Sequence, residues 1–172
     1  MTAAELCKQL AAPTRWVSQQ AKLRLMDLPK AEALAATRNW VKSLDAGDPE
    51  LEHKLYEAIG VFESHEEVNR PLLERLLNAK DHRARAYATR VLGRWHDRLD
   101  KPLALLKQRA ADESPRVRLE ALVAASDERT ADSITVVALA ADGPADRPTG
   151  WPAGQPVGWG AGMTGSISRW PF

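Results

Sequence analysis

Apolar residues in the first 141 positions recur with the period of an amphipathic α-helix. One run follows the spacing i, i+4, i+7, i+8 and i+11 and consists of Leu51, Leu55, Ala58, Ile59 and Phe62. A second run, within 84–95, keeps helical spacing over three turns. The strict alternation of a half-buried strand is absent from this region. The pattern therefore predicts an all-α fold.

Six prolines divide this region into helices: Pro13, Pro29, Pro49, Pro71, Pro102 and Pro115. Proline fits the first turn of a helix because the N–H that it lacks would have no partner there. Asp48 and Ser114 precede two of them and are typical N-cap residues. These signals predict helices near 3–11, 14–27, 30–44, 49–64, 68–78, 82–96, 102–111 and 115–126, with a partial ninth at 130–141.

A repeat is visible in the second helix of each predicted pair. Four alanines, Ala21, Ala58, Ala88 and Ala121, follow one another at intervals of 37, 30 and 33. A period in this range on paired helices is typical of an α-solenoid, and a small side chain lets the second helix of a pair approach its neighbour closely. We therefore expect an α-solenoid of antiparallel helix pairs.

The motifs within this repeat resemble HEAT repeats. In that family an Asp-bearing turn is followed by Val-Arg and then by Ala three residues on. Residues 112–121 fit this pattern well and 81–88 fit it fairly, whereas the first pair has Ser18 where Arg is expected. The resemblance covers roughly 3–126 and implies a non-catalytic protein-interaction scaffold.

A narrower resemblance rests on the order of the segments 11–17, 48–58, 83–92 and 114–121. It is similar to the HEAT-repeat portion of PVC-type haem-binding proteins, the membrane-bound-dehydrogenase-like chains of planctomycetes. In that family a propeller-like dehydrogenase region precedes the repeats and a cytochrome c module with CxxCH follows. Because this chain carries neither, the resemblance implies a fragment or spacer without a cofactor, located in the cell envelope or periplasm if such a parent exists.

Composition changes abruptly near Asp142. Residues 143–172 hold seven of the ten glycines, five of the eleven prolines and three of the six tryptophans. This segment has too few aliphatic side chains for a core, so we expect a helical repeat domain over 1–141 and a disordered tail over 142–172. The alternative is that Trp151, Trp159 and Trp170 act as docking aromatics.

Charge and targeting signals narrow the classes of partner. Lys and Arg number 24 against 23 Asp and Glu, a formal net charge of +1. A dedicated nucleic-acid or polybasic membrane binder would show a cationic surplus, so we expect a protein partner or neighbouring domains of a larger chain. We find no signal peptide and no uncharged apolar stretch long enough to span a bilayer, so the default expectation is a cytoplasmic chain without a membrane span.

Two sets of arginines are candidate site residues. Arg85 and Arg118 head the two clearest repeats, and we expect each to pair with a carboxylate near a helix N-terminus, such as Asp81 or Asp112, in a structural ladder between repeats. The alternative is that these arginines line an anion site.

The second set, Arg83, Arg90 and Arg94, falls on one stripe of the helix 82–96. The alternative function places phosphates on this stripe, as in HEAT-like nucleic-acid-binding proteins that include a class of DNA glycosylases. Asp97, Asp100 and the acidic run 63–67 balance the stripe, which favours a solvated face instead.

No residues point to catalysis or to a bound metal. The four histidines form no HExxH motif, and the single cysteine, Cys7, excludes an internal disulfide and a CxxC metal site. His53 and Glu57 stand at i and i+4, which could hold a metal but is more simply an exposed helical pair. We therefore expect no enzyme activity, no cofactor and no metal.

The last predicted helix, 130–141, has no second helix to complete its repeat, so one end of the predicted solenoid is unpaired. Ile134, Val137, Ala138 and Ala141 form an apolar stripe, with Val136 and Leu139 beside it, and no partner helix follows. Terminal repeats need a polar outer surface to stay soluble. We therefore expect self-association through this open C-terminal repeat.

Overall fold

The computed structural model describes residues 1–126 and 131–141, and every regular element in these two ranges is helical. A short 3₁₀ turn, η1 (His96–Arg98), was not expected from the apolar spacing. The helices are α1 (Ala3–Gln9), α2 (Arg15–Asp27), α3 (Lys30–Ser43), α4 (Leu51–Ser64), α5 (Arg70–Leu77), α6 (His82–Arg94), α7 (Pro102–Ala110), α8 (Pro115–Ser126) and α9 (Ala131–Ala141).

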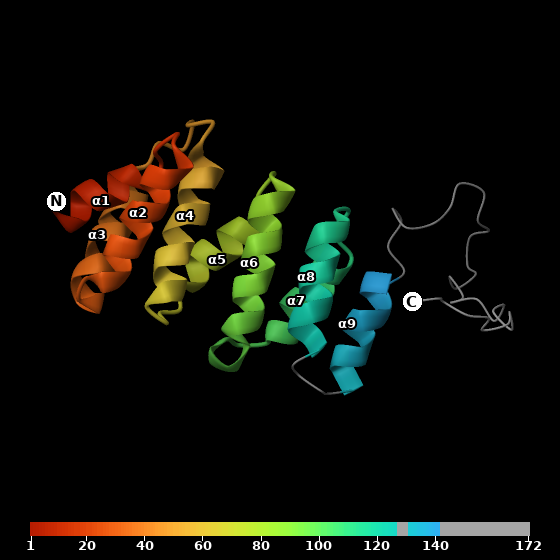
Figure 1. The fold of residues 1–172 in the computed structure, drawn as a ribbon. Coiled ribbons are helices and arrows are strands. Elements are labelled where there is room, and N and C mark those ends of the chain that lie inside the picture. The colour runs from red at the N-terminus through yellow and green to blue at the C-terminus, as the bar shows by residue number, and fades with distance from the viewer. Residues whose placement is uncertain (127–130, 142–172) are drawn as a thin grey trace, which may run out of the picture.

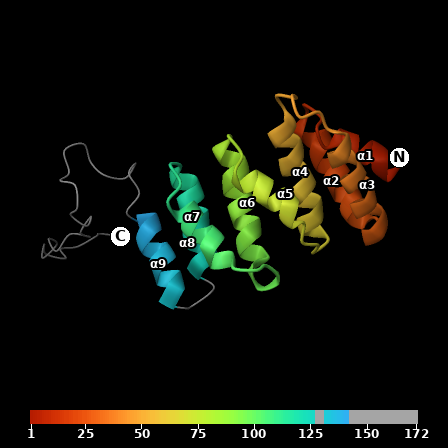
Figure 2. The same cartoon turned by 180° about the vertical axis from the view of Figure 1, so that it is seen from behind.

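The helices form successive antiparallel pairs, α1/α2, α3/α4, α5/α6 and α7/α8, followed by α9 (Figure 1). The second helices pack on one another, α2 on α4, α4 on α6 and α6 on α8, and the first helices α1 and α3 are in contact. Both views show the pairs following one another along one axis from the N-terminus (Figure 2). The predicted α-solenoid is confirmed.

The spacing of alanines and prolines marks the architecture correctly. Ala21, Ala58, Ala88 and Ala121 are all at most 1% exposed, as close packing of the second helices requires. The six prolines stand within two residues of a helix start. Several boundaries differ by one or two residues. For example, α4 begins at Leu51 rather than 49, because the Asp48 carboxylate accepts a hydrogen bond from the Glu50 N–H in the preceding turn.

Gly93 of α6 packs closely against Ala124 of α8. A Cβ added at Gly93 would stand 2.5 Å from the Cβ of Ala124 and 3.1 Å from its Cα. Real Cβ atoms essentially never approach another atom to 2.5 Å, so a larger residue fits only if the helices shift. Gly93 therefore sets how tightly the third and fourth pairs pack.

Two adjoining apolar clusters form the core. The smaller one joins the first two pairs around Leu6, Leu10 and Leu25, and the larger one runs from α3 to α9 around Phe62 and Trp95. The partly buried Trp40 packs against both clusters. The core is thus continuous along the stack, as a solenoid requires.

The last helix, α9, packs on α7 and α8 in the place of the first helix of a further pair. It buries Val136 and Ala140 against them, whereas Ile134 is 68% and Val137 37% exposed. Ala138 is exposed as well. The predicted apolar stripe therefore faces outward in the described part of the helix; the side chain of Ala141 lies outside that part.

The predicted tail, 142–172, lies outside the described residues, so the boundary at 141 stays a prediction. Among the helices that are described, none is long and apolar enough to cross a membrane.

Candidate functional site

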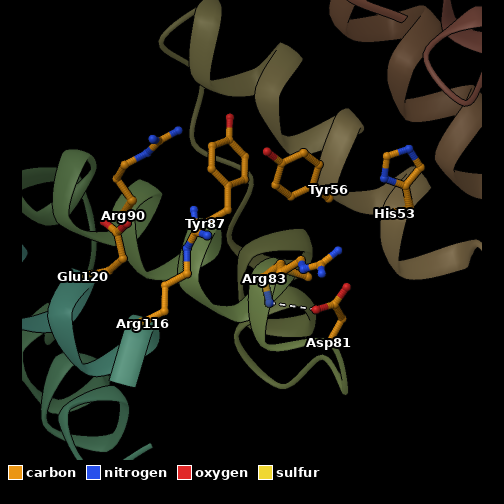
Figure 3. A pocket seen from close by; sticks show the side chains of 9 residues that line it. His53, Tyr56, Asp81, Arg83, Tyr87, Arg90, Arg116 and Glu120 are labelled. Carbon is orange, nitrogen blue, oxygen red and sulfur yellow. Dashed lines mark hydrogen bonds between the residues drawn. The ribbon is translucent and has the colours of Figure 1, made fainter. Parts of the chain in front are cut away.

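A cavity of about 280 Å³ opens on the face formed by the second helices. Side chains from three successive repeats surround it, with His53 and Tyr56 on α4 at one end and Arg116 and Glu120 on α8 at the other (Figure 3). Between them α6 contributes Arg83, Ala84, Tyr87 and Arg90, and Asp81 stands at the start of that helix. The cavity therefore combines aromatic rings with three guanidinium groups.

The repeat explains why these residues meet. Arg83 and Arg116 are separated by the same interval as the repeat alanines Ala88 and Ala121, so the two arginines occupy the same position on α6 and α8. Tyr87 lies four residues after Arg83 and three before Arg90, which puts all three on one face of α6. Neighbouring second helices then bring their corresponding faces together.

An aromatic row forms one wall of the cavity. The rings of His53 and Tyr56 stack with their planes 14° apart and their centroids 6.2 Å apart, and the Tyr56 and Tyr87 centroids are 4.4 Å apart. The Arg90 guanidinium lies 4.7 Å from the Tyr87 centroid, a cation–π contact that holds the arginine over the ring. The row presents apolar surface next to cationic groups.

The Tyr87 hydroxyl group is bound by another residue of the protein and is not a reactive group of the cavity. Its O–H donates a hydrogen bond of 2.5 Å to Glu63 Oε2. Burial, this hydrogen bond and the Glu63 charge raise the pKa of Tyr87 well above its ordinary value. The phenol is therefore protonated at neutral pH with its one donor committed to Glu63, and Tyr87 contributes its ring to the cavity.

The three arginines of the cavity differ from Arg94 on the same helix face. In the described part of the chain no carboxylate lies within salt-bridge distance of Arg83, Arg90 or Arg116. Arg94, one turn after Arg90, reaches Glu63 at 3.4 Å and Glu66 at 3.1 Å. The stripe predicted on α6 thus divides: Arg83 and Arg90 line the cavity, and Arg94 is held by two acidic residues.

A second cluster joins the third and fourth pairs. Arg85, 8% exposed, binds both carboxylate oxygens of Asp112 at 2.9 Å, and its remaining N–H groups reach Glu113 and the carbonyls of Ala79 and Lys80. Bidentate pairs of this kind are among the strongest polar contacts in proteins. Every donor direction of this guanidinium is occupied by the protein, so Arg85 offers no anion site.

The carbonyl contacts of Arg85 recur one repeat later. Arg118, 2% exposed, donates from Nη1 to the carbonyls of Asp112 and Glu113 at 3.1 and 3.2 Å, the counterparts in the next repeat of the carbonyls that Arg85 binds. Asp81 takes a different role: its carboxylate caps α6 by accepting the Arg83 N–H at 2.8 Å. Glu52 of α4 binds the N–H groups of Lys80 and Asp81, a tie between repeats that the repeat motif does not indicate.

Two forces act on the pKa of Asp112. Burial raises it, but the hydrogen bonds from Arg85 and the Ser114 N–H, with the charges of Arg85 and Arg109, outweigh burial and lower it below its ordinary value. A carboxyl group whose pKa is lower in the folded state stabilises the fold above its unfolded pKa, about 4, and that stability is lost as the pH falls through the folded value.

We therefore expect the free energy of unfolding to fall below about pH 4, and to fall less steeply in Asp112→Asn, which cannot titrate at this position. Urea denaturation followed by circular dichroism between pH 7 and pH 3 measures both slopes. Parallel curves for the parent and the variant would show that the Asp112 carboxylate contributes nothing to the acid sensitivity.

The other residues considered as metal ligands or reactive groups, Glu57 and Cys7, are buried and contact other side chains of the protein. Glu57 is buried, with Oε2 2.5 Å from Lys22 Nζ, so the exposed pair expected with His53 does not form. Cys7 is fully buried with its Sγ 3.6 Å from Thr37 Oγ1, and burial raises the pKa of its thiol. Residues 1–126 and 131–141 contain no cluster of three metal-binding side chains.

Tyr56, Tyr87, Arg116 and Glu120 were not singled out by the sequence pattern. The signal that could have indicated them is the repeat itself, since Arg116 and Glu120 stand one full repeat after Arg83 and Tyr87. Tyr56 precedes Tyr87 by slightly less than that interval, so a fixed period misses it.

Comparison with known proteins supports the repeat over about half of the chain. Residues 69–150 match the family described as HEAT repeats, a range that covers α5 to α9 and continues beyond 141. Neither the curated proteins nor the solved structures contain a significant match. The chain therefore carries repeats of a type that commonly mediates protein interactions.

Proposed function

We propose that this chain is a non-catalytic interaction scaffold that binds a protein partner on the face formed by α2, α4, α6 and α8. The observation that carries the proposal is the cavity on this face, where three successive repeats contribute aromatic rings and arginines without carboxylate partners in the described part of the chain. Tyrosine and arginine are, with tryptophan, the residues enriched among those that dominate binding at protein interfaces.

Partner capture tests this proposal. His53→Trp places a bulky ring at the rim of the cavity, and Arg75→Trp makes the same addition on the exposed side of α5. We expect a protein captured from the native host by the parent to be retained by Arg75→Trp and lost by His53→Trp. Equal retention by both variants would place the interaction elsewhere.

We also propose that the exposed stripe of α9, Ile134, Val137 and Ala138, mediates contact with a second copy of the chain. Fully burying a valine side chain contributes about 1.5–3 kcal/mol, so the exposure of this stripe to water forgoes a substantial stabilisation that a second copy could supply.

Light scattering over a dilution series should show an apparent mass that falls on dilution for the parent. Val137→Glu should be monomeric throughout, because a charge on the stripe opposes its burial. Thr135→Glu, on the same helix but off the stripe, should behave as the parent does. A parent that is monomeric at every concentration would contradict the expectation.

The role of a spacer in a larger haem-binding, dehydrogenase-like protein rests on the sequence resemblance alone. Reading the DNA on both sides of the gene tests it, since an in-frame CxxCH module or dehydrogenase segment would support this role. Flanking frames that encode neither would remove it.

A further inference from the structure

The cavity offers donors that the folded chain leaves unused. Arg83, Arg90 and Arg116 are exposed, and in the described residues each lacks the carboxylate that holds Arg85 and Arg94. A guanidinium group has five N–H donors in a planar fork, which fits a carboxylate with two parallel hydrogen bonds. Three such forks around one cavity favour an anionic ligand.

The aromatic wall strengthens this preference. Tyr56 and Tyr87 are only partly exposed and exclude water from one side of the cavity. Hydrogen bonds to an anion gain strength where water is excluded. Because the Tyr87 phenol is committed to Glu63, the ring supplies apolar surface for the carbon atoms of a ligand side chain.

The surrounding charges favour a carboxylate over a nucleic-acid backbone. Glu120 and Asp81 stand in the cavity wall and would repel a run of phosphates. On either side of the cavity the face is neutralised, by the Lys22–Glu57 pair and by Arg94 with Glu63 and Glu66. A nucleic acid needs a continuous cationic track, whereas about 280 Å³ admits one or two acidic side chains.

We infer that this cavity binds the carboxylate side chains of an acidic segment of the protein partner through Arg83, Arg90 and Arg116. The inference rests on the proposed function and specifies the chemistry of the partner. The mixed charge of the wall confines recognition to one or two carboxylates inside the cavity, because further acidic side chains there would meet Glu120 and Asp81; the rest of the acidic segment stays outside the cavity.

Fluorescence anisotropy with labelled hexaglutamate peptide at low salt tests the inference. Replacing any one of the three arginines by glutamine should weaken binding about tenfold, the usual effect of losing a hydrogen bond to a charged group. Arg94→Gln is the matched control: it makes the same change on the same helix at an arginine that already has acidic partners, and should bind as the parent does. Circular dichroism checks that the exposed substitutions leave the helices intact.

Three results would overturn the inference. Hexaglutamate binding that responds equally to Arg90→Gln and Arg94→Gln is the first, and no hexaglutamate binding by the parent is the second. The third is tighter binding of labelled hexathymidylate than of hexaglutamate, which would assign the cavity to nucleic acid. The first two results leave the proposed function standing if partner capture is still lost in His53→Trp, whereas the failure of both experiments would reject the scaffold proposal as well.

Discussion

Replacing Arg85 with methionine is expected to lower the free energy of unfolding by about 3–5 kcal/mol, the usual cost of removing one partner from a buried ion pair. The Asp112 carboxylate is only 7% exposed and would lose both of its hydrogen bonds from the guanidinium. The carbonyls of Ala79 and Lys80 would lose a donor as well. The effect is large because the Arg85 side chain links the turn before α6 to the turn before α8.

Arg94→Met provides the control. Arg94 also bridges two repeats through Glu63 and Glu66, but its side chain is 58% exposed. Exposed ion pairs contribute about 0–1 kcal/mol, so this variant should stay close to the parent in urea denaturation. Similar losses in the two variants would mean that burial of the Arg85–Asp112 pair does not determine its contribution.

Gly93→Ala is expected to lower the free energy of unfolding by about 1–3 kcal/mol, although alanine favours a helix over glycine by about 1 kcal/mol. The new Cβ would meet Ala124 at 2.5 Å, so α6 and α8 must move apart and loosen the packing on both sides. The substitution therefore reverses the sign that helix propensity alone predicts.

A double-mutant cycle isolates this contact. Ala124→Gly should destabilise the parent but stabilise Gly93→Ala, because it removes the atom that clashes. Gly47→Ala is the control, since its Cβ would meet only Asp45 at an ordinary 3.6 Å, and it should change stability by less than about 0.5 kcal/mol. Additive effects at 93 and 124 would show that the helices accommodate the methyl group without strain.

The fold could be predicted from the sequence because its signals are local. Proline at a helix start and apolar residues at helical spacing act within one turn, and they place the helices within about two residues of their observed bounds. The interval between Ala88 and Ala121 then fixes which helices correspond. The turn η1 was missed because three residues after Trp95 carry no periodic signal.

The site could be predicted only in part, because its contacts cross repeats. Arg83 and Arg90 share a stripe that is readable on one helix, but their aromatic neighbour Tyr56 lies on the preceding second helix. Arg94 lies on the same stripe of α6 as Arg83 and Arg90, but its environment differs because Glu63, near the C-terminal end of α4, forms an ion pair with it. Asp81 accepts the N–H two residues on, as Asp112 does, but the preceding second helix offers Glu52 to this turn where α6 offers Arg85 to the next one.

The most direct test of the scaffold proposal is site-specific photo-crosslinking in the native host. Benzoylphenylalanine replaces His53 at the rim of the cavity in one variant and Gln108, exposed on α7, in another. The account predicts a crosslinked protein partner from position 53 and none from position 108. Crosslinks from position 108 alone, or from neither position, would contradict the assignment of the second-helix face as the binding surface.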